Sequence, residues 1–469
     1  MENKIKDMTT RQSVLLLIGL AGFISYSMLQ LELPPRLTLL LAVVLASVSC
    51  LLLGHSTKQV ENYIISGIKK CGYVIAILII IGCVIGSWVV SGIIPSIVYY
   101  GLEILTPTTF IIGGLISCSL VSYFTGSLYA CIGTIGVALM GIGQGLGMPL
   151  PLTAGLVLSG SVFGDKMSPF SDTTNLASAS AGVPLFSHIH SMLYTTIPAW
   201  LISAVLFLYF GTSAIDTSVD TANAIALQQV IESHFNISPF LLLVPLLTIV
   251  VAIKKTPSVI AMSIGAITGI AAAFIFQSQF EANTILMSLI EGLNYDFGSD
   301  DVNQLFANRG GLTSMLFAIT IAILALVLGE ILKEIGMLTA LIKGLEKFIT
   351  NVTSLVICTI LTCITTVMIS ASEYLSIVMP GEALKLLYKK RGVSRKVLSR
   401  SLEDGATMFS SLVPWSVNAV FITSTLGVAT LDYLPFAFFS LLCPILSIIY
   451  AAFGIAVWDD KNDEEIEAI

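Results

Sequence analysis

The sequence predicts an all-α polytopic membrane protein, and its composition and apolar stretches support this fold class. Hydrophobic residues make up 55% of the 469 residues and charged residues only 11%, whereas a soluble domain carries about 25% charged residues. The mean hydropathy is +0.93. No polar linkers divide the long apolar stretches into soluble domains. We therefore expect a single transmembrane domain over residues 1–469, embedded in the lipid bilayer.

A helix needs about 20 apolar residues to cross a bilayer, and the sequence offers about 11 to 12 such spans. The candidate spans are residues 13–31, 37–53, 71–90, 108–124, 128–146, 149–163, 192–210, 240–253, 258–276, 313–332, 354–370 and 433–457. Several are short or broken by Gly and Pro. Irregular backbone at membrane depth is tolerated where protein or a water-filled cavity surrounds it, so the broken spans indicate a transport pathway.

The charges predict how the chain lies across the membrane. Basic residues gather near the N-terminus at Lys4, Lys6 and Arg11 and within residues 385–400, so both regions are expected in the cytoplasm. The acidic segments 211–238 and 277–312 are expected outside. The acidic tail 459–469 is predicted to be a solvated cytoplasmic terminus. Both termini would then be cytoplasmic in a multi-pass protein of the cell (inner) membrane.

Other features narrow the functional class. The formal net charge is −7 and no basic block is interleaved with aromatic residues, which excludes a nucleic-acid partner. The eight cysteines form no CxxC pair and the four histidines are scattered, so no disulfide or zinc site is expected. No phosphate-binding glycine loop and no nucleophile–base arrangement occurs. We expect a protein without a cofactor that is not an enzyme.

The most polar segment within the apolar sequence is residues 164–175, GDKMSPFSDTTN. It holds two carboxylates, one ammonium, four hydroxyls and an amide, and Ser168-Pro169 disfavours a continuous helix and leaves carbonyl groups free. Oxygen atoms of these kinds are the ligands that a small hard cation takes in place of water. One interpretation is a solvated loop in which Asp172 and Thr173 cap the next helix. The small apolar residues 176–186 favour a re-entrant hairpin instead. Lys166 is expected to pair with Asp165 or Asp172.

A second polar segment, residues 400–418, lies in the other half of the chain. Each polar segment follows a polar break in an apolar run, Thr125-Gly126-Ser127 in the first half and residues 370–374 in the second. The offsets agree, because 371 − 126 = 245 and 410 − 168 = 242. We predict two repeat halves, approximately 71–210 and 313–457. Matching interrupted segments in two halves of a transporter indicate a binding site near the membrane midplane.

Four acidic residues of the second half carry expectations of their own. Glu373 lies in an apolar context, so it is a candidate proton carrier, although a hydrogen-bonded structural acid would give the same pattern. Burial favours the protonated carboxyl and a nearby cation favours the ionised one, which is the competition that proton coupling needs. Glu403 and Asp404 follow the basic run closely and are expected to pair with Arg395 or Arg400 at the cytoplasmic surface. Glu330, near the end of a span, is expected at the interface.

The segment GDKMSPFSDTTNLA, residues 164–177, resembles the signature of the NhaC family of sodium/proton antiporters, a group that also includes malate/lactate antiporters. LSRSLEDGATMFSSLVPW at 398–415 and EYLSIVMPG at 373–381 resemble segments of the family's second half. The resemblance implies an inverted-repeat fold with discontinuous helices and paired re-entrant hairpins, usually in a homodimer. By position it implies that the first half-site is lined by Asp165, Ser168, Ser171, Asp172, Thr173 and Asn175.

Two segments depart from the family pattern. The family usually reads Gly-Asp-Gln-Tyr where this chain has Ala371-Ser372-Glu373-Tyr374, and Gly-Thr-Ser-Trp-Gly-Thr where this chain has GSLYAC at 126–131. The expected acid is therefore a serine, and the neighbouring amide is an acid. These changes leave the transported substrate open.

We therefore expect a secondary active transporter that exchanges sodium for protons, with Asp165, Asp172 and Glu373 binding a cation or a proton in competition. Asp172 and Asn175 are the expected ligands of the transported sodium ion, with the hydroxyls of Ser168, Thr173 and Thr174. The remaining residues expected at the site are Gly126, Ser127, Ser171, Ser372, Tyr374, Thr407, Ser410, Ser411 and Asn418. The alternative is a cation- or proton-coupled carrier of a small organic carboxylate or an amino acid on the same fold.

Overall fold

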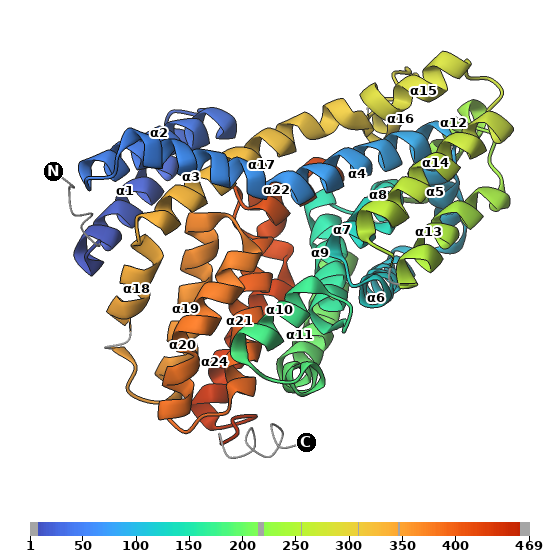
Figure 1. Cartoon of the computed structure of the whole chain (residues 1–469). Helices are drawn as coiled ribbons and strands as arrows, with labels where there is room; N and C mark the ends of the chain where they lie inside the picture. Colours follow the sequence, from blue (N-terminus) through green and yellow to red (C-terminus); the bar gives the residue numbers. More distant parts are fainter. Residues whose placement is uncertain (1–7, 214–219, 255, 308, 346–347, 460–469) are drawn as a thin grey trace.

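The computed structural model describes residues 8–213, 220–254, 256–307, 309–345 and 348–459, and these residues form an all-α polytopic membrane protein. Figure 1 shows a broad body that extends into a narrower arm. Helices α3 (Thr57–Lys70), α4 (Gly72–Val90) and α17 (Gly311–Glu334) pack along one another and connect the two parts.

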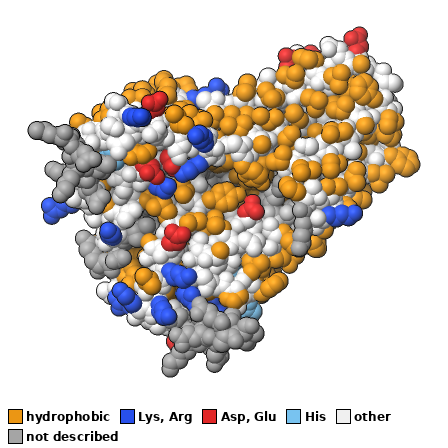
Figure 2. All heavy atoms as spheres, in the orientation of Figure 1, with side chains coloured by type: hydrophobic (Ala, Val, Ile, Leu, Met, Phe, Trp, Pro, Cys, Tyr) orange, Lys and Arg blue, Asp and Glu red, His pale blue; other side chains and the backbone are white. Residues whose placement is uncertain are grey.

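The body contains the N-terminal helices and most of the second half of the chain. Its helices are α1 (Thr10–Leu29), α2 (Pro35–Leu52), α9 (Leu150–Met167), α10 (Asp172–Ala181), α11 (Leu185–Ser213), α18 (Met337–Leu345), α19 (Val352–Ser370), α20 (Glu373–Lys390), α21 (Arg395–Ser410), α22 (Val417–Leu426) and α24 (Phe438–Phe453). The arm holds α5 (Ile93–Ile104), α8 (Val137–Gly145), α12 (Asp220–His234), α13 (Leu243–Ile253), α14 (Ser258–Phe276), α15 (Ala282–Glu291) and α16 (Asp300–Phe306) (Figure 1). Hydrophobic side chains cover most of the visible face of the arm, as a surface in contact with lipid requires (Figure 2).

Nine helices of the described residues are long and apolar enough to cross a membrane, or up to eleven if each of two bent helix pairs is one span. The bent pairs turn by 96° at 224–253 and by 91° at 417–436. The predicted span 71–90 is part of a longer helical stretch, Thr57–Val90. The predicted span 433–457 contains a short 3-10 helix, Leu434–Phe436, followed by the 16-residue helix α24. Helices α20 and α21 are not among the helices apolar enough to cross a membrane, because acidic and basic side chains lower their hydropathy.

The same order of broken elements occurs in both halves. Helix α6 (Pro107–Thr125) and α19 are both 19 residues long, and α10 and α22 are both 10 residues long. The starting positions differ by the same amount, because 352 − 107 = 245 and 417 − 172 = 245. Helices α6 and α19 both end at a residue in the left-handed conformation, Gly126 with φ 64° and Ala371 with φ 54°.

The basic segment and the acidic loops lie in different parts of the molecule. The backbone N–H of Ser394 donates to the Trp458 carbonyl at 2.8 Å, which brings the basic segment beside the C-terminal end of the described chain. Helices α15 and α16, from the acidic segment 277–312, lie at the far end of the arm (Figure 1). Lys4, Lys6 and the tail beyond residue 459 lie outside the described residues.

Candidate functional site

Two adjoining cavities lie where the broken helices of both halves meet. The first has a volume of about 390 Å³ and the second about 240 Å³. Both are lined by Tyr73, Tyr129, Glu373 and Tyr374. Glu373 therefore borders both cavities, and this position marks it as the centre of the candidate site.

Four helices begin at these cavities: α7 (Leu128–Cys131), α10, α20 and α22. Serine side chains cap three of them, because Ser127, Ser372 and Ser416 accept hydrogen bonds from backbone N–H groups of the first turns at 3.2, 3.4 and 3.1 Å. A helix N-terminus carries partial positive charge and favours nearby anions. The chain breaks thus direct polarised N–H groups toward one region inside the protein.

The first half of the chain contributes a carboxylate and hydroxyl group to the larger cavity. Asp165, near the end of α9, is 7% exposed, and its Oδ1 accepts a hydrogen bond from Ser171 Oγ at 2.8 Å. Ser171 Oγ in turn lies 3.0 Å from Thr173 Oγ1. Asp172, in the first turn of α10, also lines this cavity, as do Gly126 and Ser127. Oxygen atoms from α9 and α10 therefore converge at one wall.

The second half contributes Glu373 and its hydrogen-bond partner. Asn418 Nδ2 donates to Glu373 Oε2 at 2.9 Å and to Ser410 Oγ at 2.8 Å. The Tyr129 hydroxyl, from the first half, donates to Asn418 Oδ1. Glu373 is 8% exposed, and its Oε1 has no hydrogen-bond partner among the described residues. Asn418 thus links the two halves through a chain of hydrogen bonds that leaves one carboxylate oxygen free.

Several predicted site residues lie outside the first cavity and hold its chain breaks in place. Asn175 Nδ2 donates to the carbonyls of Pro169 and Ser171 at 3.0 and 2.7 Å. Ser168 Oγ donates to the Tyr123 carbonyl at 2.6 Å, and Thr174 Oγ1 donates to the Lys166 carbonyl at 2.9 Å.

In the second half, Ser410 and Ser411 donate to carbonyls of their own helix at 2.8 and 3.2 Å. Thr407 is buried on α21, and Ser372 lines only the second cavity. Among the residues predicted for the site, those at the first cavity are Gly126, Ser127, Asp165, Ser171, Asp172, Thr173, Glu373 and Tyr374. Tyr73 and Pro257 also line the larger cavity. The sequence did not predict them, because their segments contain no polar signal.

Lys166 does not pair with Asp165 or Asp172, and that expectation is wrong. Its ammonium forms an ion pair with Asp404, and both side chains have no exposed surface. The expected surface position of Glu403 and Asp404 is also wrong, because both residues are fully buried. A lysine on α9 lies opposite α21, so the two polar segments neutralise each other inside the protein.

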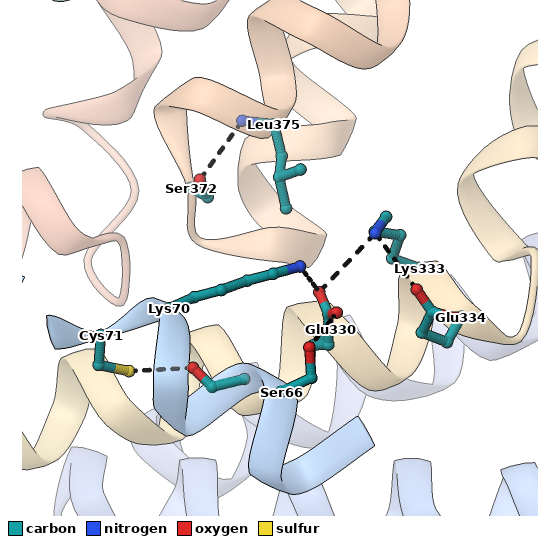
Figure 3. A network of polar contacts seen from close by, with 9 residues as sticks. Ser66, Lys70, Cys71, Glu330, Lys333, Glu334, Ser372 and Leu375 are labelled. Atoms are coloured by element: carbon teal, nitrogen blue, oxygen red, sulfur yellow. Dashed lines mark hydrogen bonds and ion pairs between the residues drawn. The ribbon is translucent and has the colours of Figure 1, made fainter. Parts of the chain in front are cut away.

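Glu330 is buried as well, and the expected interfacial position is wrong. It accepts a hydrogen bond from Ser66 Oγ at 2.8 Å and forms an ion pair with Lys70 at 2.5 Å (Figure 3). Lys333 lies 4.0 Å away on the same helix. Lys70 also lines the second cavity, so this network joins α3 and α17 beside the site.

The fold and the site together define the class of protein. Matched broken helices in two halves of a polytopic chain, with charged and hydroxyl groups converging at the breaks, are the organisation of a secondary active transporter.

The chain belongs to the NhaC family of Na+/H+ antiporters. The family profile described as Na+/H+ antiporter family matches residues 4–174 and 160–455. The chain is 36% identical to the Na(+)/H(+) antiporter NhaC of Alkalihalophilus pseudofirmus, over 97% of this chain and 98% of that protein. It is 38% identical to NhaC of Bacillus subtilis, over 95% and 98% of the two chains. It is also 35% identical to the malate-2H(+)/Na(+)-lactate antiporter of Bacillus subtilis, over 96% of each chain.

Proposed function

We propose that this protein exchanges Na+ for protons at the cavity beside Glu373. The observation that carries the proposal is the charge of the cavity wall. Asp165, Asp172 and Glu373 line it, and none of its described lining residues is basic. A cavity with several carboxylates and no compensating cation favours bound cations, either Na+ or protons.

The same groups supply the chemistry that exchange needs. Carboxylate and hydroxyl oxygens of Asp172, Asp165 and Thr173 are hard ligands suited to a small dehydrated cation. A proton on a carboxyl removes the negative charge that holds the cation. Sodium binding therefore releases protons, and protonation releases sodium. The site holds either Na+ or protons, but not both at once.

The orientation of the chain follows from its charges. We place the basic segment 385–400 and both termini in the cytoplasm, and the acidic segment 277–312 outside, in the cell (inner) membrane. Lys and Arg side chains gather over the body and are sparse on the visible face of the arm (Figure 2). The homodimer that the family resemblance implies stays a prediction.

A second candidate function is exchange of a small organic carboxylate. Helix N-termini at both cavities favour an anion, and Lys70 lines the second cavity. The 35% identity to a malate/lactate antiporter agrees with this candidate. The three carboxylates of the first cavity oppose it unless protons or Na+ bind with the anion.

Proton release from purified protein tests the proposal. Detergent-solubilised protein in weak buffer with a pH dye is mixed with NaCl, and separately with KCl and choline chloride. We expect acidification with NaCl only, and little release from Glu373→Gln. Glu382→Gln is the matched control, because Glu382 is an exposed carboxyl on the same helix. Release that is equal for all three salts, or unchanged in Glu373→Gln, would contradict the proposal.

A further inference from the structure

The exchange described above leaves one buried titratable group unused, the carboxyl of Glu403. Glu403 lies on α21 and has no exposed surface. Neither of its oxygens has a hydrogen-bond partner in the described part of the chain. Burial of an unpartnered carboxyl is costly, so its position calls for a role that changes with protonation.

Glu403 belongs to a row of polar side chains on one face of α21. Ser399, Glu403, Thr407 and Ser410 follow one another at intervals of four, four and three residues. At roughly 100° per residue they fall within about 80° of the helix circumference. Each is at most 2% exposed. A buried row of hydroxyl and carboxyl groups along a helix forms a polar path through apolar surroundings.

One end of the row reaches the cavity. Asn418 Nδ2 donates both to Ser410 Oγ and to Glu373 Oε2. Thr407 Oγ1, Glu373 Oε1 and both Glu403 oxygens are buried without a hydrogen-bond partner among the described residues. On the polar face of α21, Thr407 lies one turn from Glu403 and one turn from Ser410, which shares Asn418 with Glu373.

The other end of the row approaches the surface. Ser399 Oγ lies 2.9 Å from His188 Nδ1 and donates to the Lys396 carbonyl at 3.0 Å. Lys396 lies in the half-buried first turn of α21. This end belongs to the basic segment that we place in the cytoplasm.

Charged and titratable groups of the neighbouring helices set the electrostatic field at Glu403. Lys166 attracts a negative charge there, while Asp165, Asp404 and Glu373 repel it. Buried or cavity-lining groups on α21 and on the helices packed against it also include Asp172 of α10, His188 of α11, Cys363 of α19, Tyr388 of α20, Arg400 of α21 and Cys443 of α24. A cation that leaves or enters the cavity changes this balance, so the charge at Glu403 is coupled to the state of the site.

We propose that Glu403 is a second proton-carrying group, which exchanges protons with Glu373 through the Thr407 hydroxyl and connects the cavity with the N-terminal end of α21. In each transfer an O–H bond on one carboxyl breaks and an O–H bond on the other forms, with the Thr407 hydroxyl giving one proton and taking another. No oxidant or reductant is needed. The inference rests on the proposed function, because a carrier of organic anions alone would not need this path.

Two fluxes in proteoliposomes test the inference. The first is exchange of radioactive sodium for unlabelled sodium, which needs only the cation site. The second is proton flux driven by a sodium gradient, read with a pH dye. In Glu403→Gln and Thr407→Val we expect proton flux to fall about tenfold or more, while sodium–sodium exchange stays within about twofold of the unchanged protein. Thr407→Ser should restore proton flux because it keeps the hydroxyl, and Glu382→Gln is the matched control.

The outcomes separate the two proposals. Equal loss of both fluxes in Glu403→Gln and Thr407→Val would show that α21 acts only through the structure of the site and would overturn the inference. Unchanged proton flux would overturn it as well. Absence of any sodium-driven proton flux in the unchanged protein would instead contradict the proposed function.

Discussion

Lys166 and Asp404 come from opposite halves of the chain and form an ion pair in which neither side chain has exposed surface. Asp404 Oδ1 also accepts a hydrogen bond from Thr195 Oγ1 at 3.3 Å, so the carboxylate joins α9, α11 and α21. A buried charge without its partner is strongly unfavourable. The pair therefore ties the two polar segments together inside the protein.

Removal of one partner of this pair should destabilise the protein. We expect Lys166→Met or Asp404→Leu alone to reduce the free energy of unfolding by about 3 to 5 kcal/mol, because the remaining charge stays buried. The double variant should recover much of that loss, since apolar groups of similar size need no partner. Thermal unfolding in detergent measures all three proteins. Equal stability of the single and double variants would show that the charges do not depend on each other.

Asp172→Asn should abolish coupled exchange while the protein still inserts and folds. Asp172 lies at the start of α10 on the cavity wall, and an amide keeps the shape of the side chain but cannot carry a negative charge or a proton in exchange. Asp432→Asn is the matched control, because Asp432 is an exposed carboxyl near the start of the short helix α23 (Thr430–Tyr433). Sodium-dependent dequenching of a pH dye in vesicles, at matched protein levels, measures the effect. Normal exchange by Asp172→Asn would remove this residue from the site.

Gly126→Ala at the first chain break should destabilise the protein, whereas Ala371→Gly at the corresponding second break should stabilise it. Gly126 has φ 64°, and a Cβ there would lie 2.6 Å from the Phe170 carbonyl carbon at the cavity. Gly126→Ala should therefore lower both stability and transport. Ala371 already holds a strained φ of 54°, so Ala371→Gly should relieve about 1 to 2 kcal/mol. Thermal unfolding and transport assays compare the two, and a stabilising Gly126→Ala would contradict the described geometry.

The network around Glu330 predicts unequal roles for two lysines. Lys70 Nζ lies 2.5 Å from Glu330 Oε2, whereas Lys333 Nζ lies 4.0 Å away. We expect Lys70→Met to cost about 1 to 3 kcal/mol because it leaves the buried carboxylate without its closest cation. Lys333→Met should cost less than about 1 kcal/mol, because its ammonium lies farther from the Glu330 carboxylate and donates to Glu334 instead. Chemical or thermal unfolding of the two variants measures which substitution costs more stability.

The sequence predicted the class of fold, and it singled out Asp165, Asp172 and Glu373, three carboxylates that line the first cavity. Glu373 stands out because an acid within an apolar run has few structural explanations, and Asp172 stands out because its polar segment lies between apolar stretches. The Lys166–Asp404 pair could not be predicted, since it joins residues 238 positions apart and local charge favoured Arg400 as the partner.

At Asn175 the residue type was misleading. Its amide suited a cation ligand by residue type, but two carbonyl groups freed by the break at Pro169 take its N–H groups. Residue type alone identified the polar segment. Only the fold distinguishes the residues that face the cavity from those that hold the chain break.

Sodium-driven proton movement in proteoliposomes tests the central claim most directly. Purified protein is reconstituted with a pH dye inside, and separate pulses of sodium, potassium, malate, lactate and amino acids are applied outside. We predict internal pH change with sodium alone, its half-saturating concentration rising as the pH falls because protons and sodium compete for Asp165, Asp172 and Glu373. Proton movement with an organic solute and none with sodium alone would contradict the account and show that this site carries an organic anion.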